Sequence, residues 1–168
     1  MKNRIKNTGI KTACLTALFV TVLLIPSCVV GSAGVKDSGA VFSDVQGKEW
    51  ILGEVKSASG TIRLDRQQLE ALGFRGAYTI TFEGDRLSGM GAPNRYFGPY
   101  TAGEGRALTI GNIAATLMMG LSEVPGLPEH EYFAYLNKVS RWDIRDKSLE
   151  LYSSDDSGTE KILIFTAE

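Results

Sequence analysis

Few residues of this chain have the types and spacing that an active site requires. His130 is the only histidine and stands between Glu129 and Glu131. A catalytic triad or a zinc site needs further partners around such a histidine, so the sequence favours a solvated residue at the start of a helix. The acidic segment Asp155–Glu160 could suggest a cation site, but it lacks the EF-hand spacing and is typical of a hairpin turn.

The glycine-rich and serine-containing segments also lack the context that catalysis needs. Gly89-Met90-Gly91 and Gly103-Glu104-Gly105 do not lead from a strand into a helix, as a phosphate-binding loop does. The serines are not set in a nucleophile elbow. We therefore expect no catalytic residues, no metal and no cofactor, and predict that the protein is not an enzyme.

The charge distribution differs between the N-terminal segment and the remainder. Residues 1–27 hold four basic residues and no acidic one, so the remaining 14 basic and 19 acidic residues give a net charge of −5. An acidic body argues against nucleic acid as a partner, because phosphate binding relies on basic side chains.

The two cysteines, Cys14 and Cys28, both lie near the N-terminus. The apolar stretch Ala13–Ile25 follows four basic residues, as in a secretory signal peptide. Ile25-Pro26-Ser27-Cys28 resembles a bacterial lipobox, which predicts lipidation of Cys28 and removal of Cys14 with the signal peptide 1–27. A retained membrane span and a cleaved secreted protein remain alternatives.

This arrangement predicts a protein anchored in a bilayer through acyl chains on Cys28. The bilayer would be the cell membrane or the outer membrane of a bacterium, with the body outside the cytoplasm. Residues 28–47 are rich in Gly, Ser, Ala and Asp and are expected to form a flexible tether. The folded body is expected to span residues 48–168.

The body is predicted to have an α+β fold, a mainly antiparallel sheet of short strands with one amphipathic helix packed on it. We expect strands at 50–55, 61–64, 77–83, 86–89, 107–110, 113–118, 142–144, 149–151 and 162–165, and a glycine- and proline-rich loop at 90–99. A short helix is expected to begin at Asp65, which can cap it, to turn Leu69 and Leu72 inward, and to end at Gly73.

The main helix is expected at about 128–139. Its apolar side chains recur at three- and four-residue spacing and are Tyr132, Phe133, Leu136 and Val139. Glu129 and Glu131 suit the positive end of the helix dipole.

Several segments together resemble the META-domain (HslJ-like) family. These are the Gly89–Tyr100 segment, Leu108–Ile110 followed by Ala115–Gly120, the helix Glu131–Val139, the strands at 142–144 and 149–151, and the opening Trp50-Ile51-Leu52. The resemblance covers about residues 48–168. It implies a small antiparallel β structure with one helix and a bacterial envelope location, and it implies no particular reaction.

Two positions depart from the family pattern. Pro93 and Gly120 stand where relatives often carry cysteines. The disulfide that such a pair could form in relatives is therefore not expected here.

The most distinctive candidate surface is the segment Gly89–Tyr100. Asn94, Arg95, Tyr96 and Tyr100 could contact a partner or ligand there. Alternatively, the glycines permit tight packing, Asn94 bonds within its own turn, and the tyrosine rings cover an edge of the core.

Three functions remain open at this point. The first is a non-enzymatic envelope module that binds or supports another envelope protein. The second is a small-ligand carrier with a pocket between the sheet and the helix. The third is an enzyme or an enzyme inhibitor. An exposed apolar patch would favour the first, and a concave pocket would favour the second. A cleft that contains acids with shifted pKa values would favour the third.

Overall fold

The computed structural model describes residues 39–118 and 124–167. Its elements are a 3₁₀ turn at Phe42–Asp44, β1 (Glu49–Ser57), β2 (Gly60–Arg63), α1 (Arg66–Ala71), β3 (Thr79–Glu83), β4 (Arg86–Met90), β5 (Arg95–Ala102), a 3₁₀ turn at Glu104–Arg106, β6 (Leu108–Ile110), β7 (Ala114–Ala115), α2 (Glu129–Asn137), β8 (Arg141–Arg145), β9 (Ser148–Ser154) and β10 (Glu160–Ala167). The predicted α+β class is confirmed.

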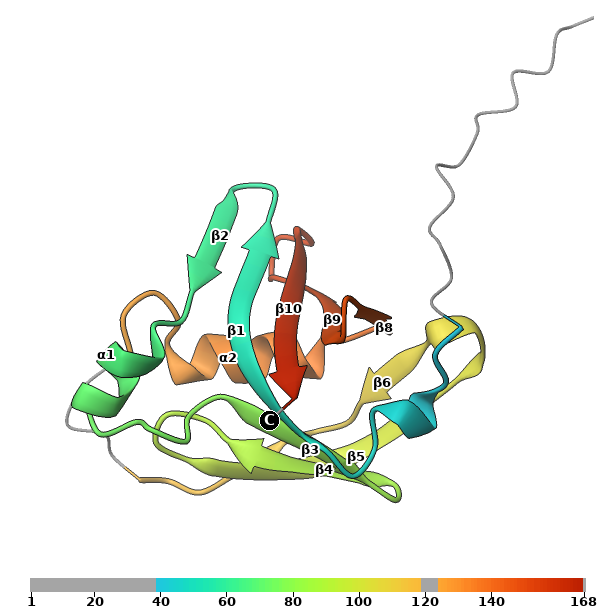
Figure 1. Cartoon of the computed structure of the whole chain (residues 1–168), viewed down its shortest axis with the longest axis horizontal. Helices are drawn as coiled ribbons and strands as arrows, with labels where there is room; N and C mark the ends of the chain where they lie inside the picture. The colour runs from blue at the N-terminus through green and yellow to red at the C-terminus, as the bar shows by residue number, and fades with distance from the viewer. Residues whose placement is uncertain (1–38, 119–123, 168) are drawn as a thin grey trace, which may run out of the picture. The chain divides into compact units, whose positions relative to one another are not determined.

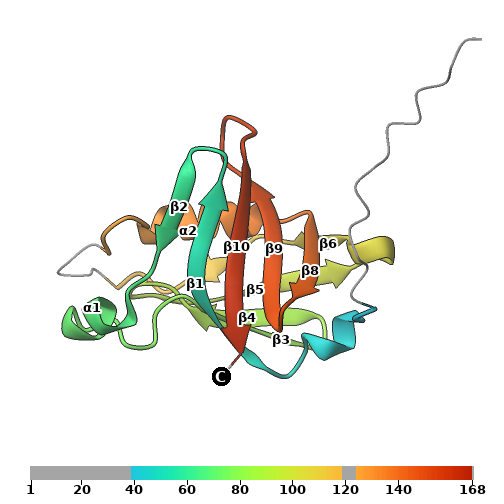
Figure 2. The same cartoon turned by 45° about the horizontal axis from the view of Figure 1, so that its top comes forward.

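The strands form one antiparallel sheet that almost closes on itself. Its order is β6-β5-β4-β3-β1-β10-β9-β8, with β2 paired to β1 and β7 paired to β5. A bridge between Ala107 and Arg141 and a hydrogen bond from Leu108 N–H to the Ser140 carbonyl oxygen link the two ends. In Figure 1, α2 crosses behind β1 and β10. Figure 2 shows the row β2-β1-β10-β9-β8 standing over β3, β4 and β5.

Strand β1 changes partners along its length, and this creates the local geometry next to α1. Residues 49–51 pair with β3, whereas residues 54–57 pair with β2. The register against β10 shifts between Leu52 and Glu54, so Gly53 is the extra residue of a bulge. Because β2 and β3 diverge at this bulge, the chain between them has room for α1.

The short helix α1 forms largely as predicted. The Asp65 carboxylate accepts hydrogen bonds from the N–H groups of Gln67 and Gln68, at 2.9 and 3.2 Å. Gly73, at φ +86°, follows its end. Leu69 is buried, but the prediction for Leu72 was wrong: this side chain is 38% exposed, because the six-residue helix ends just before it.

The main helix α2 packs against the sheet through Tyr132, Tyr135 and Leu136, which are buried. Leu136 was predicted at this interface, and it has no exposed surface. Phe133 is only half-buried. Tyr135 joins the buried face although it lies outside the predicted stripe, because β9 also covers this side of the helix: the Ser153 hydroxyl donates to the Tyr135 carbonyl oxygen at 2.5 Å.

The predicted loop at 90–99 is wrong in its second half. Residues 95–99 belong to β5, in which Tyr96, Gly98 and Tyr100 are buried and the residues between them are exposed. Pro99 does not interrupt the strand. It lies opposite Arg86, and the hydrogen bond at this point is made by the next residue, whose N–H donates to the Asp85 carbonyl oxygen at 3.0 Å. The predicted strand 113–118 is reduced to Ala114–Ala115.

The folded body also begins earlier than Lys48. Val45 has no exposed surface, and its carbonyl oxygen accepts a hydrogen bond from the Trp50 indole at 2.8 Å. The Phe42 ring lies 5.1–5.4 Å from the rings of Phe82, Tyr100 and Trp142. The prediction that the flexible tether extends to residue 47 was therefore wrong for residues 42–47, because one aromatic and one β-branched side chain suffice to dock this segment. Residues 1–38, including the predicted signal peptide and Cys28, lie outside the described residues.

Candidate functional site

The four residues suggested as a contact surface do not form one. Asn94, Tyr96 and Tyr100 are buried, at 7%, 1% and 7% exposure, and only Arg95 is exposed. Buried side chains cannot contact a partner, so the surface prediction was wrong for three of the four residues. The strand alternation of β5 turns both tyrosines into the core.

Tyr96 belongs to a buried group of three tyrosines. Its hydroxyl donates to the Thr79 carbonyl oxygen at 2.7 Å and lies 2.8 Å from the Tyr132 hydroxyl. The Tyr78 hydroxyl donates to the Leu127 carbonyl oxygen at 2.6 Å, and its ring meets the Tyr132 ring edge-on. Burial raises the pKa of all three phenols well above its ordinary value. These side chains fill the space between sheet and helix in which a ligand pocket was considered.

Asn94 and Glu129 hold the turn before β5 against the start of α2. One Glu129 carboxylate oxygen accepts hydrogen bonds from the backbone N–H groups of Ala92 (2.5 Å) and Asn94 (2.7 Å), and the other accepts from Asn94 Nδ2 at 2.6 Å. Asn94 Oδ1 accepts from the Thr116 hydroxyl at 2.9 Å and the Met118 N–H at 2.6 Å. The polar atoms of Asn94 are thus satisfied within the chain.

Tyr100 closes the opposite end of β5. Its hydroxyl donates to the Gly84 carbonyl oxygen at 2.8 Å and accepts from Gln46 Nε2 at 2.7 Å. Its ring lies 5.0 Å from that of Phe82. Tyr100 therefore stabilises the fold where the N-terminal segment docks, and Arg95 alone of the predicted set remains available to a partner.

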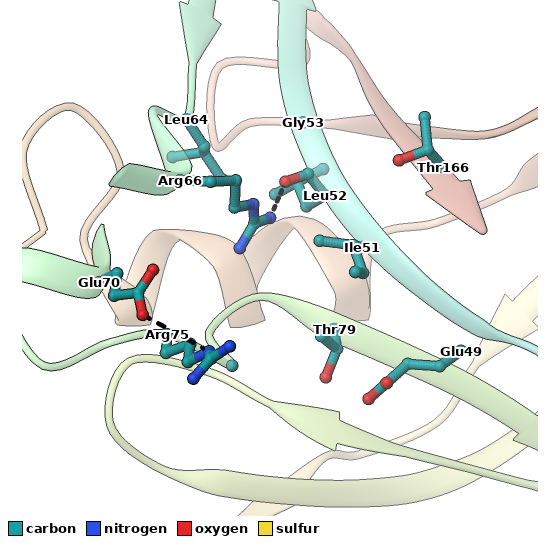
Figure 3. A pocket seen from close by; sticks show the side chains of 11 residues that line it. Glu49, Ile51, Leu52, Gly53, Leu64, Arg66, Glu70, Arg75, Thr79 and Thr166 are labelled. Atoms are coloured by element: carbon teal, nitrogen blue, oxygen red, sulfur yellow. Dashed lines mark hydrogen bonds and ion pairs between the residues drawn. The ribbon is translucent and has the colours of Figure 1, made fainter. Parts of the chain in front are cut away.

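A cleft beside α1 is the strongest candidate for a binding site. It has a volume of about 640 Å³ and lies between β1, α1 and the start of β3 (Figure 3). Small-molecule sites in proteins commonly measure about 300–1,000 Å³. Charged side chains from three segments line it together with apolar ones; the charged residues are Glu49, Arg66, Glu70 and Arg75.

Arg66 is the central polar group of this cleft. It is half-buried, and its guanidinium donates to the backbone carbonyl oxygens of Ala77, at 2.7 Å, and Leu52. Burial lowers the pKa of Arg66 from its ordinary value, but a guanidinium stays charged in proteins. No acidic side chain among residues 39–118 and 124–167 forms an ion pair with it.

The other charges of the cleft are differently placed. Glu70 and Arg75 form an ion pair at 3.6 Å, and both are well exposed. Glu49 is exposed at the start of β1. Ile51 contributes an apolar wall, and its side chain lies between Arg66 and Glu49 in Figure 3. Arg66 is therefore the one cleft cation that is both withdrawn from water and without a carboxylate partner within the described part of the chain.

Arg66 was not among the residues predicted to form a site. It lies at the predicted helix start, next to the cap Asp65. A weak signal was present, because a cation in the first turn of a helix opposes the helix dipole. Its two carbonyl partners could not be predicted, since both depend on the path of β1 and β3.

Comparison with known proteins identifies the fold family. The model of the META domain family matches residues 43–165. The chain is a member of the META domain family. The match begins before residue 48, in agreement with the packing of Phe42 and Val45.

Two solved structures resemble this META-domain protein. The NMR structure of a protein from Burkholderia xenovorans has a TM-score of 0.56 at 22% identity, covering 80% of this chain and 97% of that one. The crystal structure of a DUF4847 family protein from Bacteroides vulgatus has a TM-score of 0.50 at 15% identity, covering 76% and 96%. At these identities the likeness concerns the fold alone. A search of curated proteins found no match.

One of the two departures from the family's cysteine pattern falls at a described turn. Pro93 lies in the turn between β4 and β5 that Glu129 holds. Gly120 lies outside the described residues. The META-domain body has no cysteine after Cys28, so no disulfide can form within it.

The remaining candidates behave as ordinary surface groups. His130 is exposed at the start of α2. The Asp155 carboxylate accepts hydrogen bonds from the N–H groups of Ser157 and Thr159, at 2.9 and 3.0 Å, which closes a hairpin turn. The Ser157 hydroxyl bond and these contacts lower the pKa of Asp155 to about 2. Within the described ranges, no group of three potential ligands could hold a metal ion.

The described part of the META-domain protein contains no helix long and apolar enough to cross a membrane. The apolar stretch Ala13–Ile25 lies outside this part.

Proposed function

We propose that this META-domain protein is a bacterial envelope lipoprotein whose folded body acts by binding, without catalysing a reaction. The body would lie outside the cytoplasm, anchored to the cell membrane or outer membrane through acyl chains on Cys28. Support for the anchor comes from the sequence: a basic N-terminus, an apolar stretch of suitable length, and a lipobox-like segment ending in Cys28.

Metabolic labelling with a palmitate analogue tests the anchor. Wild-type protein is expected to carry the label, and Cys28→Ala is expected to lose it. Cys14→Ala is the matched control, because Cys14 would be removed with the signal peptide and its replacement should leave the label unchanged. A Cys28→Ala variant with full labelling would exclude lipidation at this residue.

The observation that supports a binding role is the cleft beside α1. It combines a volume suited to a small molecule or a partner's side chain with a half-buried cation that lacks a counter-charge. This cleft favours the small-ligand carrier over the envelope-partner module as the more specific hypothesis. The cleft lies beside α1, whereas the ligand pocket had been expected between the sheet and α2.

Site-specific photocrosslinking in intact cells tests whether the cleft is used. A photoreactive residue at Glu70, on the rim of the cleft, is expected to capture a ligand or partner. The same residue at Glu104 is the control, since the β5–β6 connection lies on the opposite side of the body from α1 in Figures 1 and 2. Equal capture at both positions, or capture only at Glu104, would contradict a role for the cleft.

A further inference from the structure

Arg66 forms no ion pair with any acid in the described residues. A half-buried charge has lost part of its hydration, so its attraction to an opposite charge is less screened than at an open surface. The sum over the four charged residues of the cleft is zero, but Glu70 is already paired with Arg75. Glu49 is exposed at the end of the cleft. The Arg66 guanidinium is therefore open to pairing with an anion from outside the chain.

We propose that this cleft binds the carboxylate group of a small organic anion, and that the Arg66 guanidinium holds it. This inference rests on the proposed binding function and specifies its ligand class. It follows from the position of Arg66 in a cleft of about 640 Å³ and from the absence of an internal counter-charge in the described part of the chain.

The hydrogen bonds of Arg66 orient its guanidinium before any ligand arrives. A guanidinium has five N–H donors in one plane. Two carbonyl oxygens, from Ala77 in the connection before β3 and Leu52 in β1, accept from Nη1 and Nη2. The other N–H groups have no partner among the described residues. A fixed guanidinium loses little side-chain entropy on binding, and a carboxylate can accept two of its hydrogen bonds.

The surroundings favour a carboxylate over a phosphate. A phosphate group brings up to two negative charges, which Glu49 and Glu70 in the same cleft would repel. A carboxylate brings one charge and matches the single cation of the cleft that has no ion pair. Ile51 borders the cleft beside Arg66 and offers an apolar surface for the organic part of the ligand.

Titration of the full-length protein in lipid nanodiscs with small probes tests this proposal. The probes are butanoate, the uncharged isostere butanamide and inorganic phosphate, all at constant ionic strength. Binding is followed through the NMR signals of the arginine Nε–H groups and the isoleucine methyl groups. Butanoate is expected to shift the signals of Arg66 and Ile51 with a saturable Kd on the order of 1–10 mM, and butanamide and phosphate are expected to bind at least about tenfold more weakly.

Two variants test whether Arg66 supplies the positive charge that binds butanoate. Arg66→Gln is expected to abolish saturable butanoate binding, and Arg66→Lys to weaken it at least about fivefold, since an ammonium lacks the planar fork. Arg75→Gln is the matched control in the same cleft, and we expect its Kd to stay within about twofold of wild type. If instead Arg75→Gln loses binding while Arg66→Gln keeps it, the assignment is overturned.

A further variant keeps the test valid if replacement of Arg66 impairs folding. Glu49→Gln removes an exposed like charge from the cleft and is expected to tighten butanoate binding about two- to threefold. Unchanged or weaker binding in this variant would contradict a carboxylate in the cleft, as would equal affinity for butanamide and butanoate.

The crosslinking experiment separates this inference from the proposed function. Capture at Glu70 with no saturable butanoate binding would leave the binding role in place and refute the carboxylate. Absence of both would refute both proposals.

Discussion

The segment 89–100 and the cleft beside α1 differ in whether their polar groups have partners within the chain. In the segment, Asn94 and the Tyr96 hydroxyl have hydrogen-bond partners within the chain, and the Glu129 carboxylate of α2 accepts three hydrogen bonds from it. In the cleft, Arg66 bonds only to neutral carbonyl oxygens and forms no ion pair with an acid in the described structure.

This difference shows why a distinctive sequence pattern need not mark a binding surface. The glycines and tyrosines of the segment serve packing: a methyl group on Gly89 would overlap the Thr79 carbonyl oxygen. Arg66 lies in an unremarkable sequence context, yet it is the cleft cation that has no ion pair. The two regions differ in whether each polar group already has a partner within the chain.

Alkaline pH should give the largest effect on the segment. The pKa values of Tyr78, Tyr96 and Tyr132 are raised by burial, whereas an unfolded chain ionises near pH 10. Their contribution to stability is therefore fully present below pH 10 and is lost as the pH rises toward the folded-state pKa values. Because all three phenols contribute over the same pH range, the combined loss is expected to be a large fraction of a typical total stability of about 5–15 kcal/mol.

Phenolate absorbance and near-ultraviolet circular dichroism check this prediction. The three tyrosines should ionise only as the tertiary signal disappears, above about pH 10. Ionisation of all six tyrosines near pH 10 in a protein that stays folded would show that Tyr96 lies at the surface after all.

The next largest effect is expected for Gly89→Ala. The added methyl group would overlap the Thr79 backbone and lie 2.8 Å from the Tyr96 hydroxyl, so β3 or β5 must shift. We expect a loss of about 3 kcal/mol or more in free energy of unfolding, measured by denaturant titration. The neighbouring exposed substitution Ser88→Ala should change it by less than about 0.5 kcal/mol. Equal effects of the two would mean that β3, β4 and β5 pack less tightly than described.

Glu129→Ala should cost about 2–3 kcal/mol in the same measurement. Its removal leaves the N–H groups of Ala92 and Asn94 and the Asn94 amide without their charged acceptor. His130→Ala is the matched control, because His130 is adjacent in sequence and exposed. A loss below about 0.5 kcal/mol for Glu129→Ala would show that water replaces the carboxylate readily.

Much of the fold could be predicted because its signals are local. Period-two alternation marked β3 and β9, the Asp65 cap and Gly73 bounded α1, and the three- and four-residue spacing located α2. The docking of Phe42 could not be predicted in this way. Its partners Phe82 and Trp142 come from distant parts of the chain.

Less of the candidate site could be predicted, for the same physical reason. Strand alternation alone would have placed Tyr96 and Tyr100 on one buried face had residues 95–102 been recognised as a strand; Gly98 and Pro99 hid that pattern. The cleft depends on the bulge at Gly53 and on the divergence of β2 and β3. No local pattern around Arg66 reports either.

The smallest effect on the free energy of unfolding is expected for Arg66→Met. This variant also tests the contrast between the segment 89–100 and the cleft most directly. This change removes two hydrogen bonds to carbonyl oxygens but also removes a half-buried charge that forms no ion pair with a described acid. The two contributions oppose each other, so the loss in free energy of unfolding should not exceed about 1 kcal/mol. A loss as large as that of Glu129→Ala would mean that Arg66 stabilises the fold, and the contrast between the two regions would disappear. Repeating the melt with 50-fold more butanoate than its Kd should stabilise the wild type by about 2 kcal/mol and leave Arg66→Met unchanged, because only the folded wild type binds the anion.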